Sequence, residues 1–159
     1  MQGSAQKARQ IVSYFSDYEG YHRTHGNKVC HYFGVPLIVF SSLGLLWQLS
    51  PSAGPVGEGS AYVINYALIL WGATSLWYLK LDFGPGVLFS LLLLVLAVVA
   101  SKIQLPLLWF IFVGGWIIQF VGHIVYEKKS PAFFKNLRHM FIAPFWIFCK
   151  AIRVDRALN

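Results

Sequence analysis

Five histidines and six acidic residues are the side chains of this chain that could bind a metal ion or transfer a proton. The histidines gather near the ends of long apolar segments, and none lies at the centre of one. His22 and His31 flank the start of the first segment, whereas His123 and Glu127 stand at the end of the last. His123 and Glu127 are spaced i, i+4 and share one helical face. Histidine and carboxylate ligands that converge with open coordination positions suit a non-haem Fe(II) site.

A short turn between two predicted helices brings two of these histidines toward each other. Asn27 is a suitable N-cap, and His31 lies one turn inside the helix that Asn27 would start. His22 is expected on the last turn of the preceding helix. A turn at His25, Gly26 and Asn27 therefore points His22 and His31 at one volume.

Each of these side chains also has a purely structural interpretation. A single histidine at a membrane interface is commonly a hydrogen-bonding surface residue, and His25, in the turn, is expected to be solvated. Glu127 could form an ion pair and have no role as a ligand. The cations near it in this arrangement are Arg23, Lys128 and Lys129. The sequence leaves three roles open for His139: a metal ligand, a hydrogen-bond partner of the ligands, or a surface residue. The joint placement of His22, His31 and His123 favours a shared site, because ionisable groups near lipid are costly and usually functional.

The composition indicates that these residues belong to a membrane protein. Of 159 residues, 57% are hydrophobic, 17% aromatic and only 12% charged. A soluble domain has about 45–50% apolar and ~25% charged residues, and a disordered chain lacks apolar residues. The net charge of +7 suits anionic lipid headgroups, since the basic residues lie between apolar runs and no nucleic-acid-binding module is present. Cys30 and Cys149 make neither a disulfide framework nor a zinc motif.

Four apolar runs predict transmembrane helices, each of which needs ~20 residues. They extend from Val29 or Tyr32 to Leu49, from Ala61 to Leu79, from Gly86 to Ser101 and from Leu105 to Tyr126. Apolar positions in residues 5–24 predict a helix that either lies in the membrane interface or caps the bundle. Residues 140–149, interrupted by Pro144, predict a short interfacial or re-entrant helix. Gly114, Gly115 and Gly122 are expected to let the last span approach its neighbours closely. The expected fold is one all-α integral membrane domain over residues 1–159.

The basic residues predict the orientation of this domain. With four spans, all of the 13 lysines and arginines except Lys102 fall on the side of the N-terminus. The positive-inside rule assigns that side to the cytoplasm, so both termini are expected there. The corresponding membrane is the endoplasmic reticulum in a eukaryote and the inner membrane in a bacterium.

Three stretches of sequence resemble the motifs of a known enzyme family. They are YHRTHGNKVCHYFGVP at residues 21–36, GWIIQFVGHIVYEKKSPA at residues 115–132, and Ala143-Pro144. These motifs are similar to those of the fungal-type 2-hydroxy fatty acid dioxygenases, which act in phytosphingosine α-oxidation. The resemblance extends over about residues 10–150.

The resemblance implies an Fe(II)-dependent enzyme that acts on a 2-hydroxy long-chain fatty acid and O₂. The products would be the fatty acid one carbon shorter, CO₂ and water. The family's histidines correspond to His22, His31 and His123 and its acid to Glu127; these four are the predicted catalytic residues and metal ligands, and His139 is a further candidate ligand. No ligand role is transferred to His25.

Other functions for a bundle of this kind remain open from the sequence. A di-iron desaturase has about eight clustered histidines, some of them adjacent, and this chain has five with no adjacent pair. A haem-binding membrane protein would use two axial histidines from different spans. A bundle that only binds lipid would need no metal at all.

Overall fold

The computed structural model describes residues 2–51, 65–131 and 136–152, and every regular element in these ranges is a helix. The helices, in chain order, are α1 (Gln2–Gly20), α2 (His25–Gln48), α3 (Tyr66–Leu81), α4 (Phe83–Ala100), α5 (Leu105–Val121), the π-helical η1 (Gly122–Glu127) and α6 (Arg138–Ala151). This agrees with the predicted all-α class.

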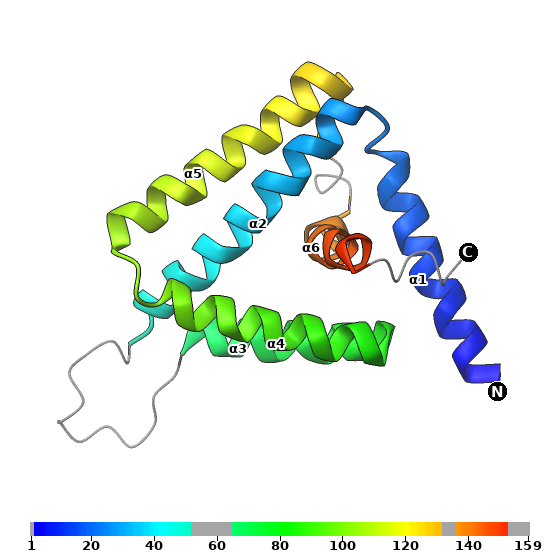
Figure 1. The fold of residues 1–159 in the computed structure, drawn as a ribbon, viewed down its shortest axis with the longest axis horizontal. Coiled ribbons are helices and arrows are strands. Elements are labelled where there is room, and N and C mark those ends of the chain that lie inside the picture. Colours follow the sequence, from blue (N-terminus) through cyan, green and yellow to red (C-terminus); the bar gives the residue numbers. More distant parts are fainter. Residues whose placement is uncertain (1, 52–64, 132–135, 153–159) are drawn as a thin grey trace.

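Two antiparallel helix pairs form the frame of the molecule. In Figure 1, α2 lies along α5 and α3 lies along α4. The pairs meet where α2, α4 and α5 come together and diverge toward the opposite end, where α1 is found. The N-terminal part of α2 and the end of α5 lie at this diverging end.

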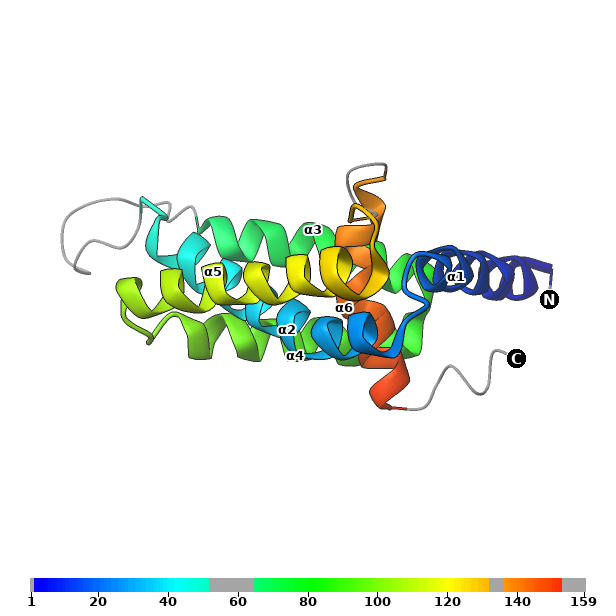
Figure 2. The same ribbon diagram turned by 90° about the horizontal axis from the view of Figure 1, so that it is seen from above.

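Helix α6 fills the space between the two pairs and crosses them (Figure 2). Its buried face includes Phe145 and Trp146, which pack with Tyr18 of α1, Tyr78 of α3 and Phe89 of α4. The Tyr78 hydroxyl donates a hydrogen bond of 2.8 Å to the carbonyl of Phe141. This aromatic contact joins four helices and fixes the position of α6 relative to α1.

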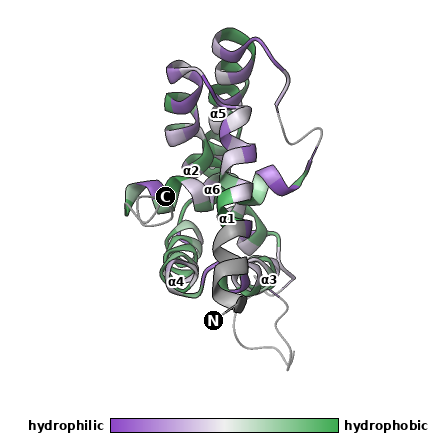
Figure 3. Ribbon diagram, turned by 90° about the vertical axis from the view of Figure 1, so that its right-hand side faces the viewer, coloured by the Kyte–Doolittle hydropathy of each residue, from purple (hydrophilic) through white to green (hydrophobic). Residues whose placement is uncertain are grey.

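Three helical stretches are long and apolar enough to cross a membrane, judged over the described ranges. They are His25–Gln48, Phe83–Ala100 and Leu105–Glu127. Figure 3 shows α3 and α4 mainly in the hydrophobic colour, and outward-facing side chains such as Phe110 and Leu88 are exposed. Helix α3 has 16 residues, and most of the predicted start of its span, at Ala61–Asn65, lies outside the described residues.

The ends of several elements differ from the prediction. Helix α2 begins at His25 rather than after Asn27, because Thr24 and not Asn27 is the N-cap: the Thr24 side chain accepts from the backbone N–H of Asn27. Helix α6 continues through Pro144, which was expected to interrupt it. Predicted features at residues 52–64, including the loop between the first two spans, are outside the described ranges, as are Lys135, Arg153 and Arg156.

Candidate metal centre

Three buried histidines from distant parts of the chain meet at the end of the molecule where the two helix pairs diverge. His22 follows α1, His31 lies in the second turn of α2, and His123 lies in η1. One ligand atom from each lies within 4.8 Å of the others, and together they form a group that could hold a metal ion. The ring centroids are separated by 4.3 Å, 5.1 Å and 4.9 Å. The structure therefore brings together the three histidines that the sequence placed at one membrane face.

Backbone carbonyls orient two of these rings. Nδ1 of His22 lies 2.6 Å from the carbonyl oxygen of Tyr18, and Nδ1 of His31 lies 2.9 Å from that of Asn27. A carbonyl only accepts, so each Nδ1 carries the proton and each Nε2 keeps its lone pair. Burial lowers the pKa of His22 to about 4, which keeps its ring neutral at pH 7. These are the tautomers that metal ligation by Nε2 requires.

An unpaired ring nitrogen further indicates that these histidines bind a transition-metal ion. Nδ1 of His123 is buried and has no hydrogen-bond partner, although buried imidazole nitrogens are normally paired. Three neutral imidazoles that converge on one point suit Fe, Zn, Cu or Ni. The cluster indicates a metal site without specifying which of these ions it holds.

A π-helical turn positions His123. The segment Gly122–Glu127 continues α5 with wider turns, an irregularity that often occurs at functional sites. A Cβ atom on Gly122 would lie 2.6 Å from Oδ1 of Asn27 and 2.8 Å from Cβ of Cys30. Glycine at this position therefore lets η1 approach α2, and Lys128, in the left-handed conformation, ends the segment.

Of the other two glycines of the last span, only Gly115 shares this role. Gly115 lies against α2, since a Cβ there would be 2.8 Å from Ile38. Gly114, by contrast, has no atom within 4 Å of its would-be Cβ, so the prediction that it makes a close helix contact was wrong. It faces the other side of α5.

Glu127 lies next to the cluster and binds the start of α2. Its Oε1 accepts from the backbone N–H of Arg23 at 3.1 Å. Its Oε2 accepts from the Thr24 N–H at 3.1 Å, the Thr24 hydroxyl at 2.9 Å and Nδ2 of Asn27 at 3.1 Å. A carboxylate is also favoured at a helix N-terminus by the helix dipole. Glu127 thus connects the end of η1 to the turn that carries His22.

Glu127 is not part of the three-histidine group, and a role as ligand stays a prediction. The contacts that the structure shows are with the backbone of Arg23, not with its guanidinium, which donates to the carbonyl of Gly20 at 3.2 Å. For Arg23, the alternative of an ion pair with Glu127 gives way to a hydrogen bond from its backbone N–H.

His139 enters the same region from α6. Its Nε2 lies 2.9 Å from Oδ2 of Asp17 on α1, and its Nδ1 is buried without a partner. It lines the pocket but is not in the three-histidine group. His25 is exposed at the start of α2, as expected for a solvated turn residue.

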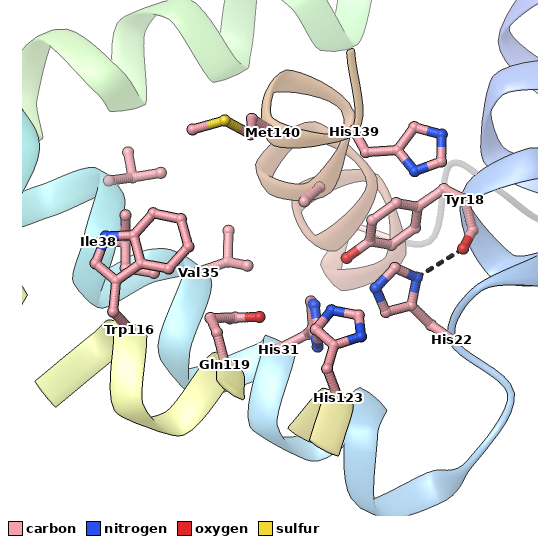
Figure 4. A pocket seen from close by; sticks show the side chains of 12 residues that line it. Tyr18, His22, His31, Val35, Ile38, Trp116, Gln119, His123, His139 and Met140 are labelled. Atoms are coloured by element: carbon pink, nitrogen blue, oxygen red, sulfur yellow. Dashed lines mark hydrogen bonds between the residues drawn. The ribbon is translucent and has the colours of Figure 1, made fainter. Parts of the chain in front are cut away.

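A cavity of about 80 Å³ adjoins the cluster. Figure 4 shows His22, His123 and Tyr18 on one side of it and Trp116 and Ile38 on the other. The remaining lining residues are His31, Val35, Val39, Gln119, His139, Met140 and Ala143. The cavity therefore has a polar end beside the possible metal position and an apolar end between α2 and α5.

Tyr18 and Gln119 are the polar lining residues that sequence reasoning missed. Each stands four residues before one of the histidines, His22 or His123, and so shares its helical face. Gln119 is also a polar side chain within an apolar run, which was a usable signal. Tyr18 resembled the other aromatic residues of an amphipathic helix.

Comparison with known proteins gives two matches. A family model described as Mpo1-like, 2-hydroxy-palmitic acid dioxygenase, matches residues 85–155, a range that contains His123, Glu127 and His139. The 2-hydroxy-palmitic acid dioxygenase MPO1 of Saccharomyces cerevisiae is 32% identical over 135 residues, which cover 82% of this chain and 72% of the yeast protein. No solved structure matches the chain.

Proposed function

This chain belongs to the Mpo1-like family of 2-hydroxy-palmitic acid dioxygenases, and from this membership we propose that it is a membrane-embedded, Fe(II)-dependent 2-hydroxy fatty acid dioxygenase. The reaction converts a 2-hydroxy long-chain fatty acid and O₂ into the fatty acid one carbon shorter, CO₂ and water. It balances with one O₂ and needs no separate reductant. The observation that carries the proposal is the buried group of His22, His31 and His123, whose ligand atoms lie within 4.8 Å of one another.

The proposed ligands are these three histidines. A ferrous ion held there would supply O₂ binding and electron transfer. The carbonyls of Tyr18 and Asn27 hold the rings of His22 and His31 with Nε2 available. Burial of all three histidines keeps bulk water away from the reacting atoms.

Glu127 and His139 are proposed to act on the site from outside this group. Glu127, with four hydrogen bonds to residues 23–27, is proposed to set the distance between His22 and His123. His139, bound to Asp17, is proposed to support the polar end of the cavity.

The proposal includes the bilayer as a partner. We propose that α3 is a fourth span beside the three long apolar helices, so that both termini face the cytoplasm. Cysteines introduced at Gln2 and Gly57, in a background lacking Cys30 and Cys149, should be labelled from opposite sides of the membrane. Labelling of residue 2 from the non-cytoplasmic side would contradict this orientation.

The function is tested with the purified protein in detergent, supplied with Fe(II), O₂ and 2-hydroxypalmitate. We expect pentadecanoic acid as the product, measured by mass spectrometry. His123→Ala is the inactive comparison, and His25→Ala, at an exposed position, should retain activity. Absence of pentadecanoic acid from the wild-type reaction would refute the proposal, and a Soret band in the purified protein would favour haem instead.

A further inference from the structure

Buried polar atoms without partners are concentrated in the cavity beside the histidines. Over the described ranges, seven buried side-chain nitrogen or oxygen atoms have no hydrogen-bond partner. Four of them belong to residues that line this cavity: the Tyr18 hydroxyl, Nε2 of Gln119, Nδ1 of His123 and Nδ1 of His139. Such atoms are rarely left unpaired in a folded protein. Nδ1 of His123 belongs to the metal centre described above. The concentration of the other three atoms in one cavity indicates that a polar ligand completes them.

We propose that Tyr18 and Gln119 form the binding site for the head group of a 2-hydroxy acid, with Tyr18 at the carboxylate and Gln119 at the 2-hydroxyl. The inference rests on the proposed function and deepens it, because it assigns the residues that would select a 2-hydroxy acid over an ordinary fatty acid.

Tyr18 is held in place from several sides. Its ring stacks on that of His22, with centroids 4.0 Å apart and an interplanar angle of 26°, and meets His139 edge-on at 6.0 Å. In Figure 4 its hydroxyl points toward the histidine cluster. A tyrosine hydroxyl keeps its proton at neutral pH and is therefore an O–H donor. A carboxylate only accepts hydrogen bonds and therefore matches it.

Gln119 lies between the cluster and the apolar end of the cavity. It is 5% exposed and stands one turn before His123 on α5. A Cβ atom on Gly34 would lie 2.6 Å from its Nε2, so the glycine makes room for the carboxamide. A carboxamide both donates and accepts, as does a hydroxyl group.

The order of residues along the cavity assigns the two roles. Val35, Ile38 and Trp116 occupy the apolar end, Gln119 lies next, and Tyr18 lies farther from the apolar end, with its hydroxyl directed toward the histidines (Figure 4). An acyl chain that enters from the apolar end places its C2 hydroxyl beside Gln119. The carboxylate then lies further in, within reach of Tyr18.

The test measures binding, so it does not depend on turnover. Zn(II)-loaded protein in detergent is equilibrated with radiolabelled 2-hydroxypalmitate, palmitate or the methyl ester of 2-hydroxypalmitate. Tyr18→Phe should weaken binding of both acids by about tenfold or more, the usual effect of losing a hydrogen bond to a charged group. Gln119→Met should weaken only 2-hydroxypalmitate, so the preference over palmitate is lost. Wild-type protein should bind the methyl ester more weakly than the acid.

Tyr78→Phe is the matched control for Tyr18→Phe. The Tyr78 hydroxyl is also buried but donates to the carbonyl of Phe141 at 2.8 Å. Tyr78→Phe should lower the melting temperature and leave lipid affinity unchanged. Tyr18→Phe should leave the melting temperature unchanged, because its hydroxyl has no partner to lose in the free protein, and should weaken binding of the acids.

Each outcome decides the inference. Unchanged affinities in Tyr18→Phe and Gln119→Met, or wild-type protein that binds palmitate or the methyl ester as tightly as 2-hydroxypalmitate, would overturn it. If Tyr18→Phe does not fold, Gln119→Met and the methyl ester still test both roles. The predicted affinities without pentadecanoic acid formation would uphold the head-group site and refute the proposed function. Turnover with unchanged affinities in both variants would uphold the proposed function and refute the head-group site.

Discussion

The α2–α5 pair and the α3–α4 pair are both antiparallel, and each has a close approach at a glycine, but they bury different side chains. At Gly122 the first pair, continued by η1, packs beside Asn27 and carries His31, His123 and Glu127. In the second pair, Gly86 packs against the backbone of Tyr78, and neither helix contains a histidine or an acid. Close helix packing at a glycine thus builds a polar site in the α2–α5 pair and an apolar core in the α3–α4 pair.

The difference shows where this fold places its chemistry. Polar groups lie at the end of the molecule where the pairs diverge and where α1 and α6 add His22 and His139. The α3–α4 pair holds α6 in place through Tyr78 and Phe89. We therefore expect substitutions in the two pairs to separate metal binding from stability.

Glu127→Gln should have the largest effect on turnover and stability together. Glutamine has one acceptor oxygen and cannot receive all four hydrogen bonds from Arg23, Thr24 and Asn27. Hydrogen bonds to a charged group contribute about 1.5–3 kcal/mol each. We expect turnover of 2-hydroxypalmitate to fall at least tenfold, with a lower melting temperature.

Glu19→Gln is the control for Glu127→Gln. Glu19 is a partly exposed acid of α1 that pairs with Lys150 at 3.1 Å and accepts from Nε1 of Trp146 at 3.0 Å, and it does not line the cavity. Near-normal turnover and stability in Glu127→Gln would show that the carboxylate neither binds metal nor holds the turn. Loss of metal with an unchanged melting temperature would instead support the ligand role.

Gly122→Ala and Gly86→Ala should separate the two helix pairs. Each added Cβ would lie within 2.7 Å of an existing atom, and overpacking of this kind typically costs about 1–3 kcal/mol. Gly122→Ala should also lower metal content, because the displaced atoms belong to Asn27 and Cys30. Gly86→Ala should leave the metal content of folded protein unchanged. Thermal unfolding and elemental analysis measure both quantities.

Gly114→Ala is the control for these variants, since no atom lies within 4 Å of its would-be Cβ. It should be as stable as the wild type or slightly more so, because alanine favours a helix. Equal metal loss in Gly86→Ala and Gly122→Ala would contradict the division of roles between the pairs.

Asp17→Asn should have the smallest effect. Its carboxylate lies 2.9 Å from Nε2 of His139 and its side chain is 55% exposed, and asparagine keeps an oxygen that can accept the same hydrogen bond. We expect a small drop in melting temperature and unchanged metal content. Metal loss comparable to that of a variant in the cluster would indicate that His139 is itself a ligand.

The sequence predicted the meeting of His22, His31 and His123 because apolar segments of known length alternate across a bilayer. The positions of the helices followed from the same segments, with ends that differ by a few residues. Thr24 rather than Asn27 caps α2 because Asn27 turns its amide toward Glu127, a contact between residues 100 positions apart that no local pattern reveals.

Other features depend on packing between elements and were not predictable. The π-helical turn at Gly122–Glu127 requires the approach of η1 to α2. The pairing of His139 with Asp17 requires α6 to lie between the helix pairs, and a single apolar stretch does not specify its neighbours. Tyr18 became visible only as a buried group without a partner. Gln119 carried the signal of a polar side chain within an apolar run, but its place in the cavity depends on the packing of α5 against α2.

The most direct test of the three-histidine centre is the metal content of purified protein, measured by elemental analysis for the wild type and for His22→Ala, His31→Ala, His123→Ala and His25→Ala. Changing a residue that only supports a ligand typically costs ~10–100-fold in metal affinity, and loss of a ligand should cost more. We predict about one iron ion per chain in the wild type and in His25→Ala, and loss of iron in the other three. Full metal occupancy in His123→Ala would contradict the three-histidine centre.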